Sequence, residues 1–252
     1  MKAIILAAGQ GIRLRPITDN CPKCMVEFNK KPLINYILEA FKENNITDIS
    51  VIGGYKKEVL KEHLEEENVK FLVNENFDST NMVATFFCAE NELNDDVIIS
   101  YSDIIYPPEV IKKLNEDNSD FAVIVDKNWK ELWQMRMENP LDDAETMKID
   151  ANDYIYELGK KPKAYTEIEG QYIGLIKISK TFLPTVIEYY KSLDKTAIYD
   201  GKNFNNMFMT SFIQLLIDNI KKPKAIFIEG GWIEIDSLED LEIYKNSASI
   251  FI

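Results

Sequence analysis

The chain has 252 residues, of which 46% are hydrophobic and 28% charged, the proportions of an ordinary globular protein with one good core. The net charge of −13 argues against nucleic acid as a partner. No apolar run is long enough to span a membrane, so we expect no membrane partner. Three cysteines without a disulfide pattern indicate a protein of the reducing cytoplasm.

Strand and helix patterns alternate along the first half of the chain. Strands are predicted over residues 2–8, 48–53, 69–73, 96–101 and 121–125. Helices are predicted over residues 32–44, 56–66, 81–93 and 107–115, with a last one over 238–246. This order predicts an α/β fold in which a mostly parallel central sheet is flanked by helices. Ligands bind such sheets at the carboxyl ends of the strands.

The turn after the first strand is the most informative stretch. It is formed by Leu6, Ala7, Ala8, Gly9 and Gly11. The two glycines let backbone N–H groups approach phosphate oxygens with no side chain between them. Arg13, Arg15 and Lys23 follow, and only one other arginine occurs in the chain. Arginine clamps phosphate through two parallel bonds, and lysine acts as a point charge. These residue types predict an anion-binding loop for a nucleotide.

Two other nucleotide-binding loops fit the same stretch poorly. A dinucleotide-binding fingerprint requires a third glycine where this chain has Leu14, which disfavours an NAD-dependent oxidoreductase. A P-loop closes on Gly-Lys-Ser or Gly-Lys-Thr, and neither tripeptide occurs here.

Two carboxylates follow predicted strands, and both are candidates for a Mg²⁺ site. Asp103 comes just after the strand at 96–101, and Asp236 ends the run 230–236. Mg²⁺ prefers one or two carboxylates together with phosphate oxygens and water. Asp236 also stands where a helix cap is expected, before Ser237, so a purely structural role is the alternative. Glu234 is a candidate for an additional ligand.

The segment after residue 125 combines aromatic rings with both signs of charge. Trp129 and Trp133 are four residues apart and share a face if the segment is helical, so they form either a wall for a cation or part of the core. Its acids can neutralise an amine, and Arg136 can bind a carboxylate or a phosphate. These acids are Asp142, Asp143 and Glu145.

The stretch Leu-Ala-Ala-Gly-x-Gly-x-Arg-Leu, followed by Pro-Lys, resembles the signature of the nucleotidyltransferase family. Residues 79–83, 99–104, 129–145, 171–175 and 203–212 narrow the resemblance to its phosphocholine-cytidylyltransferase-like branch, over nearly the whole chain. The resemblance implies a Rossmann-like nucleotidyltransferase fold and a single domain over 1–252. Residues 126–170 are then an insertion that binds the acceptor.

The activity that the resemblance implies is transfer of CMP from CTP, with Mg²⁺ as cofactor, to a small phosphorylated amine or amino acid, releasing pyrophosphate. L-Glutamine phosphate, used in capsule phosphoramidate synthesis, is the first candidate acceptor. The alternatives are 2-aminoethylphosphonate, phosphocholine, a sugar 1-phosphate, and a regulatory module that binds a nucleotide without chemistry. In-line attack by an acceptor phosphate oxygen requires no general base. The oligomeric state stays open, a homodimer included.

The resemblance also implies roles for individual residues. Arg13 and Lys23 would bind the CTP phosphates, and Asp103 and Asp236 would hold Mg²⁺. The nucleotide site would further contain Leu6, Ala7, Ala8, Gly9, Gly11, Asn81 and Ser102. The acceptor site would contain Trp129, Trp133, Arg136, Asp142, Glu145, Lys160, Lys161 and Tyr172, with one of the adjacent lysines at the acceptor phosphate.

Overall fold

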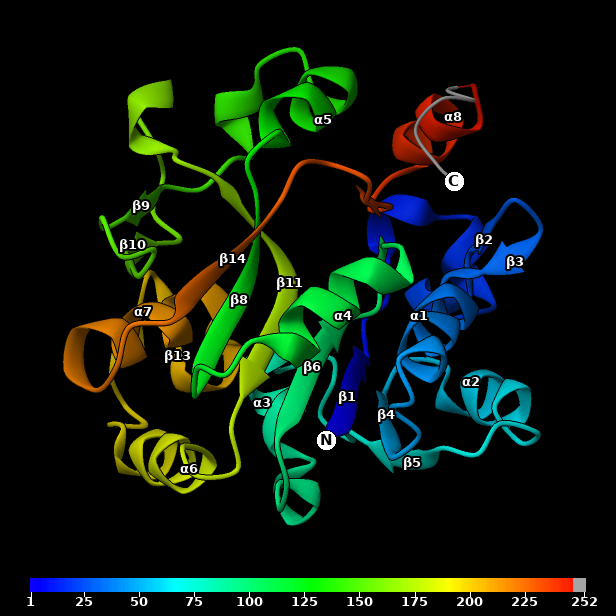
Figure 1. Cartoon of the computed structure of the whole chain (residues 1–252). Helices are drawn as coiled ribbons and strands as arrows, with labels where there is room; N and C mark the ends of the chain where they lie inside the picture. The colour runs from blue at the N-terminus through cyan, green and yellow to red at the C-terminus, as the bar shows by residue number, and fades with distance from the viewer. Residues whose placement is uncertain (247–252) are drawn as a thin grey trace.

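A computed structural model describes residues 1–246 as helices around a seven-stranded central sheet (Figure 1). The strand order is β14–β8–β11–β6–β1–β4–β5. All neighbours pair in parallel except β11, which runs antiparallel to β6 and β8. The predicted mostly parallel sheet is confirmed. Its strands are β1 (Lys2–Ala7), β4 (Ile49–Gly53), β5 (Lys70–Val73), β6 (Val97–Tyr101), β8 (Phe121–Asp126), β11 (Gln171–Ile178) and β14 (Lys224–Ile228).

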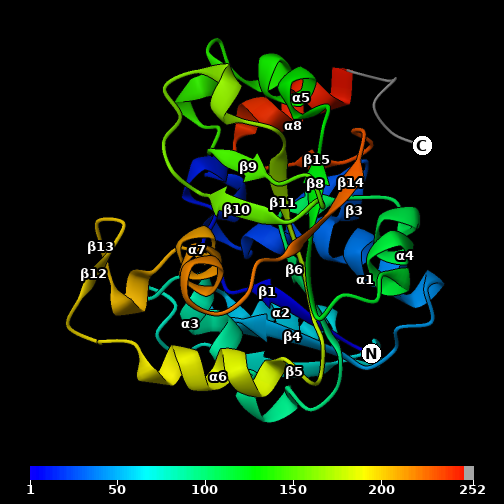
Figure 2. The same cartoon turned by 60° about the vertical axis from the view of Figure 1, so that its left-hand side comes forward.

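Helices cover both faces of this sheet, because its strands are apolar on both sides. In β1, Ala3 and Ile5 belong to one buried cluster, while Ile4 and Leu6 belong to the other. The first cluster is covered by α1 (Leu33–Glu43), α2 (Lys57–His63) and α4 (Pro108–Glu116). The second is covered by α3 (Met82–Phe87), α6 (Leu183–Ser192) and α7 (Met209–Asn219). Figure 2 shows α1 and α4 on one side of the sheet and α3, α6 and α7 on the other.

The helix predicted over 81–93 is shorter than expected. After α3 the backbone N–H groups of Cys88 and Ala89 bond three residues back, to Thr85 and Phe86, so the last turn tightens. A separate 3₁₀ turn, Glu90–Glu92, follows. The other predicted helices and strands agree with the structure to within a few residues.

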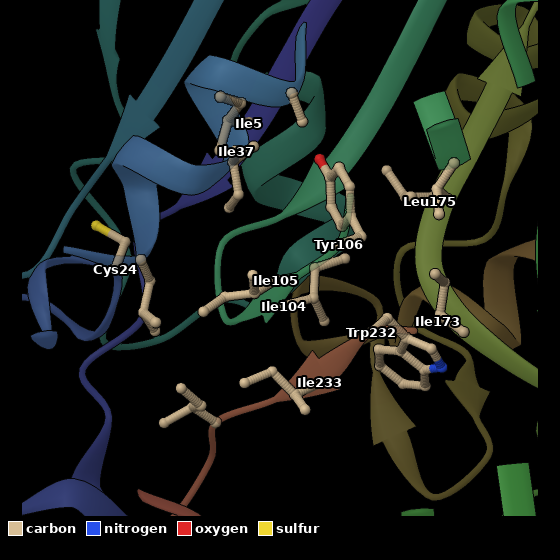
Figure 3. Packing of buried hydrophobic residues seen from close by; sticks show 14 of the residues in the cluster. Ile5, Cys24, Ile37, Ile104, Ile105, Tyr106, Ile173, Leu175, Trp232 and Ile233 are labelled. Atoms are coloured by element: carbon tan, nitrogen blue, oxygen red, sulfur yellow. The ribbon is translucent and has the colours of Figure 1, made fainter. Parts of the chain in front are cut away.

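A short ladder outside the main sheet joins distant parts of the chain. Strands β7 (Ile104–Ile105) and β15 (Ile233–Glu234) pair antiparallel, with Glu234 opposite Ile104. Figure 3 shows Ile105 and Ile233 close together, with Trp232 beside Ile173. Helix α8 (Leu238–Asn246) follows β15.

Residues 127–170 connect the paired strands β8 and β11. This connection contains α5 (Trp129–Arg136) and a two-stranded sheet of β9 (Met147–Ile149) and β10 (Ile155–Leu158). The remaining strands are β2 (Glu27–Phe28), β3 (Lys31–Pro32), β12 (Ile198–Tyr199) and β13 (Lys202–Asn203). Among the described residues, no helix has the length and apolar character needed to cross a membrane.

Candidate functional site

The loop after β1 is packed closely at one glycine and open at the other. Gly11 has a φ of +64°, and a Cβ added there would lie 3.0–3.2 Å from the side chains of Thr18 and Lys23. The Thr18 hydroxyl donates to the Gly11 carbonyl at 2.7 Å, which holds the turn closed over Lys23. A Cβ added at Gly9 meets nothing within 4 Å, so the missing side chain leaves open space beside the backbone.

The β7–β15 ladder brings the two predicted metal carboxylates together from opposite ends of the sequence. Because the pairing is antiparallel, Asp103 just before β7 lies near Asp236 just after β15. The Lys23 Nζ lies 2.7 Å from Asp103 Oδ2 and 2.6 Å from Asp236 Oδ1. Arg13 forms a further ion pair with Asp236. The structure therefore brings together all four residues predicted to be catalytic.

Asp236 is not the cap of α8, which was the alternative role for it. The Ser237 hydroxyl accepts the Asp240 N–H at 3.1 Å, and Asp240 Oδ2 accepts the N–H groups of Asp236 and Ser237 at 2.9 Å. This reciprocal arrangement is a capping box with aspartate in the acidic position. Since Ser237 and Asp240 satisfy the helix terminus, the Asp236 carboxylate remains available to face Lys23.

A cavity of about 130 Å³, here called the Lys23 cavity, opens at the carboxyl ends of β1 and β6. Seven of the predicted nucleotide-site or catalytic residues line it: Leu6, Ala8, Gly9, Lys23, Asn81, Ser102 and Asp103. Phe77, Thr80, Met82, Thr85 and Tyr101 complete the lining. Ala7, Gly11, Arg13 and Asp236 are not among the lining residues. Asn81 caps α3, with its side-chain oxygen accepting the Met82 N–H at 2.8 Å.

A second cavity, of about 220 Å³, adjoins the first and is here called the Trp133 cavity. The two share Asn81, Met82 and Tyr101. Aromatic and acidic side chains dominate the second lining, which contains Tyr101, Trp133, Asp143, Glu145, Tyr172, Trp232 and Glu234. Gln171 and Thr210 add polar groups, and no lysine or arginine is among its described lining residues. Such a lining suits a ligand that carries a positive charge.

The two tryptophans of α5 have different positions. Trp133 lines the cavity, and its indole N–H donates to Asp143 at 3.1 Å. Trp129 lies behind it, edge-on at 5.9 Å between ring centroids, and packs against Tyr165. Both indoles belong to the same buried cluster, and Trp133 alone of the two also forms part of the cavity wall.

Four other predicted acceptor residues do not line the Trp133 cavity. Arg136 is buried in ion pairs with Glu234 and Asp240, and only 2% of its side chain is exposed. Lys160 pairs with Glu157 at 3.2 Å. Lys161 donates to the carbonyls of Leu141 and Asp142, and the Asp142 carboxylate accepts from Asn139. The polar groups of all four are engaged by neighbouring residues in this structure, and their contact with an acceptor stays a prediction.

Burial changes the acidity of two carboxyls in the Trp133 cavity. Desolvation raises the pKa of Glu145 to about 7. The hydrogen bond from the Thr210 hydroxyl, 3.3 Å away, lowers this pKa by a smaller amount. Burial also raises the pKa of Glu234, and the charge of Arg136 opposes that rise. Glu145 can therefore gain or lose its charge near neutral pH.

Two residues that the sequence did not single out also shape this cavity. Trp232 lines it, and its indole N–H donates to Asp126 at 2.8 Å. The fully buried Asp126 carboxylate also accepts the N–H groups of Gly230 and Asn128, each at 2.8 Å. A carboxylate at the end of an apolar strand run was the available signal, but Gly230 and Trp232 lie about a hundred positions further along the chain.

The carboxylate pair fits a divalent cation. Asp103 Oδ1 is buried and has no hydrogen-bond partner among the described residues, although its other oxygen pairs with Lys23. In residues 1–246, no group of three or more His, Cys, Asp or Glu side chains converges on one point. A two-carboxylate site is suited to Mg²⁺, which takes its other ligands from phosphates and water.

Comparison with known proteins confirms the resemblance found in the sequence. Residues 2–133 match the family model described as nucleotidyl transferase. The chain is 50% identical to CTP:phosphoglutamine cytidylyltransferase of Campylobacter jejuni, over 96% of this chain and 98% of that protein. It is 41% identical to choline-phosphate cytidylyltransferase of Streptococcus pneumoniae, over 98% and 99% of the two chains.

Solved structures agree on the fold. CTP:phosphocholine cytidylyltransferase from Streptococcus pneumoniae superposes with a TM-score of 0.71 at 22% identity, over 97% of each chain. The inositol-1-phosphate CTP transferase of T. maritima superposes with a TM-score of 0.74 at 21% identity, over 100% of this chain and 98% of that one. The chain belongs to the nucleotidyl transferase family.

Proposed function

We propose that this enzyme transfers CMP from CTP to a small phosphorylated amine or amino acid and releases pyrophosphate, with L-glutamine phosphate as the first candidate acceptor. The observation that carries the proposal is the pair of adjoining cavities. One is lined by Gly9, Lys23 and Asp103, and the other is aromatic and acidic. The identity to the two cytidylyltransferases over nearly whole chains supports the choice of nucleotide.

In the proposed reaction, the chain acts by positioning and by neutralising charge. An oxygen of the acceptor phosphate attacks the α-phosphorus of CTP in line, and the bond to pyrophosphate breaks. No general base is required, because the attacking oxygen is already ionised. Lys23 and Arg13 would bind the triphosphate, and Asp103 and Asp236 would hold Mg²⁺. When bound, Mg²⁺ neutralises charge on the phosphate oxygens.

The acceptor would lie across the boundary of the two cavities. Its ammonium group fits the aromatic and acidic Trp133 cavity, and its phosphate would lie near the shared residues Asn81 and Tyr101. Lys160 and Lys161 are engaged elsewhere, so Lys23 is the one cationic side chain among the described residues that line either cavity. We therefore propose that Lys23 also meets the acceptor phosphate.

The same lining gives weight to a second acceptor class. The α-carboxylate of L-glutamine phosphate would find hydroxyl donors in the Trp133 cavity, such as Thr210, but no cationic side chain among the described lining residues. Phosphocholine and 2-aminoethylphosphonate carry a cation and no such carboxylate, so they remain alternatives. With L-glutamine phosphate as acceptor, the enzyme would serve capsule phosphoramidate synthesis in the cytoplasm.

Pyrophosphate release tests this proposal. The enzyme would be given CTP and MgCl₂ with L-glutamine phosphate, 2-aminoethylphosphonate, phosphocholine or glucose 1-phosphate. We expect turnover with one of the first three. Turnover with glucose 1-phosphate alone would contradict the proposed acceptor class, and CTP binding without turnover on any acceptor would favour a regulatory module.

Glu145 should make acceptor binding depend on pH. Its pKa of about 7 means that the carboxyl is neutral at lower pH and charged at higher pH. An ammonium group binds the charged form, so the acceptor KM should fall as pH rises through about 7. Measuring kcat/KM for the acceptor from pH 5.5 to 8.5 checks this, because that ratio reports ionisations of the free enzyme.

The matched control is Glu145→Gln, since the acceptor phosphate titrates in the same range with either protein. We expect this variant to raise the acceptor KM about tenfold at pH 8. The pH dependence caused by the acceptor phosphate should remain in the variant, and the pH dependence caused by Glu145 should be lost. If both proteins give the same pH profile, Glu145 does not bind the cation.

Asp126→Asn should weaken acceptor binding more than CTP binding. The asparagine amide cannot accept all three N–H groups that Asp126 accepts, so Trp232 should lose its fixed position in the cavity wall. An unsatisfied buried partner costs about 1–3 kcal/mol, which lowers Tm by several degrees. KM values for both substrates and a thermal melt check this, and an equal rise in both KM values would contradict it.

A further inference from the structure

Arg136 forms a buried ion-pair cluster with Glu234 and Asp240, here called the Arg136 cluster. The Arg136 Nη1 lies 2.7 Å from Glu234 Oε2, and Nε and Nη2 lie 2.8 and 3.2 Å from the two Asp240 oxygens. The paired bonds to Asp240 use the planar fork of arginine, a geometry that lysine cannot reproduce. Figure 2 shows α5, which ends at Arg136, beside α8, which contains Asp240.

Each partner of Arg136 belongs to a different half of the site. Glu234 lines the Trp133 cavity. Asp240 Oδ2 accepts the backbone N–H groups of Asp236 and Ser237, so it holds the start of the segment that presents the Asp236 carboxylate to Lys23. An unbroken series of contacts therefore runs from the acceptor cavity through Arg136 to the carboxylate pair.

Because the cluster is buried, its two carboxylates depend on Arg136 to neutralise their charge. Desolvation alone would lower the pKa of Arg136, but the neighbouring carboxylates of Glu234 and Asp240 raise it, so the guanidinium stays charged. Without it, the buried carboxylates of Glu234 and Asp240 would lose the charge that neutralises them, so their positions would change.

We propose that Arg136 is a positioning residue that places Glu234 in the acceptor cavity and Asp236 at the carboxylate pair at the same time. The inference rests on the proposed function. It replaces the direct contact between Arg136 and the acceptor that the sequence suggested. Arg136 touches neither substrate and acts on both halves of the reaction through its two carboxylate partners.

Three variants separate the two contacts of Arg136. Asp240→Asn breaks the contact that leads to Asp236, and Glu234→Gln weakens the contact that leads to the Trp133 cavity. Arg136→Lys weakens both contacts. The readouts are the affinity for Mn²⁺ in the presence of CTP, followed by electron paramagnetic resonance, and the acceptor KM. Mn²⁺ reports on the site because it shares the oxygen ligands and octahedral geometry of Mg²⁺.

We expect Asp240→Asn to weaken Mn²⁺ binding about tenfold, the usual size of such indirect effects, and to leave the acceptor KM within about twofold. Glu234→Gln should give the reverse pattern, and Arg136→Lys should change both quantities. Asp120→Asn, which removes the carboxylate of a surface ion pair with Lys221, controls for loss of a negative charge and should change neither.

A merely structural role predicts a different result. If Arg136→Lys lowers Tm but leaves both the Mn²⁺ affinity and the acceptor KM of the folded fraction unchanged, the positioning role is wrong. Should Arg136→Lys fail to fold, unchanged Mn²⁺ affinity in Asp240→Asn overturns the proposal equally. Mn²⁺ binding with CTP requires no acceptor turnover, so this readout still decides the matter if the proposed function fails.

Discussion

Asp103→Asn is expected to lower kcat by about 10³-fold or more while the fold is kept. The replacement has nearly the same shape but removes one of the two carboxylate charges that face Lys23 and, as we propose, Mg²⁺. Charge stabilisation by fixed groups is commonly the largest contribution to such a reaction, and a 10³-fold loss corresponds to about 4 kcal/mol. Pyrophosphate release at saturating CTP, acceptor and MgCl₂ measures the effect.

The control for this variant is Asp120→Asn. Asp120 lies just before β8 in a surface ion pair with Lys221, and it lines neither cavity. We expect near-normal turnover from it and wild-type circular dichroism from both variants. If Asp103→Asn retains turnover within tenfold of wild type, Asp103 does not hold the metal.

Lys23→Met is expected to reduce kcat by about 10²- to 10³-fold and to make the stability of the protein depend on Mg²⁺. Lys23 supplies charge to the proposed phosphates, which accounts for the loss of turnover. It also lies between Asp103 and Asp236, so its removal leaves two nearby carboxylates without their shared cation. Breaking such a partly buried pair should lower Tm by about 5 °C or more in EDTA.

Thermal melts in EDTA and in MgCl₂ separate the two effects. A bound divalent cation should neutralise the carboxylates and raise the Tm of Lys23→Met more than that of wild type, because in wild type it competes with the lysine. An equal response of both proteins to Mg²⁺ would mean that Lys23 and the cation do not share these carboxylates.

Short stretches of sequence are enough to predict much of the fold and the position of the proposed nucleotide site. The strand before Gly9 and the glycine turn are local features, and adjacent parallel strands must end at one edge, which places Asp103 near that turn. The family signature then leads to Lys23 and Asp236. The positions of residues that depend on one stretch, or on the shared edge of a sheet, could therefore be predicted.

The proposed acceptor side depends on contacts that no local pattern specifies. Four-residue spacing puts Trp129 and Trp133 on one helical face but does not show that Trp133 lines the cavity while Trp129 packs against Tyr165. Arg136 pairs with carboxylates about a hundred residues later, and nothing in its own segment indicates them. The residue types were therefore predictable, but their partners were not.

The antiparallel pairing of β8 with β11 has a consequence for how acceptor preference can change. Strand β8 ends at Asp126 and β11 begins at Gln171, and these two residues are paired in the sheet. Residues 127–170 therefore begin and end at neighbouring positions. Because these two ends are fixed side by side, changes of length in the exposed parts of the segment need not shift the register of the sheet. Its buried residues, among them Trp129, Met147 and Leu158, belong to the two core clusters and have to be kept. Under the proposed function, in which this segment contributes to the acceptor cavity, exchange of its exposed parts between relatives, with Arg136, Glu234 and Asp240 retained, would change the acceptor while leaving the nucleotide side of the site in place.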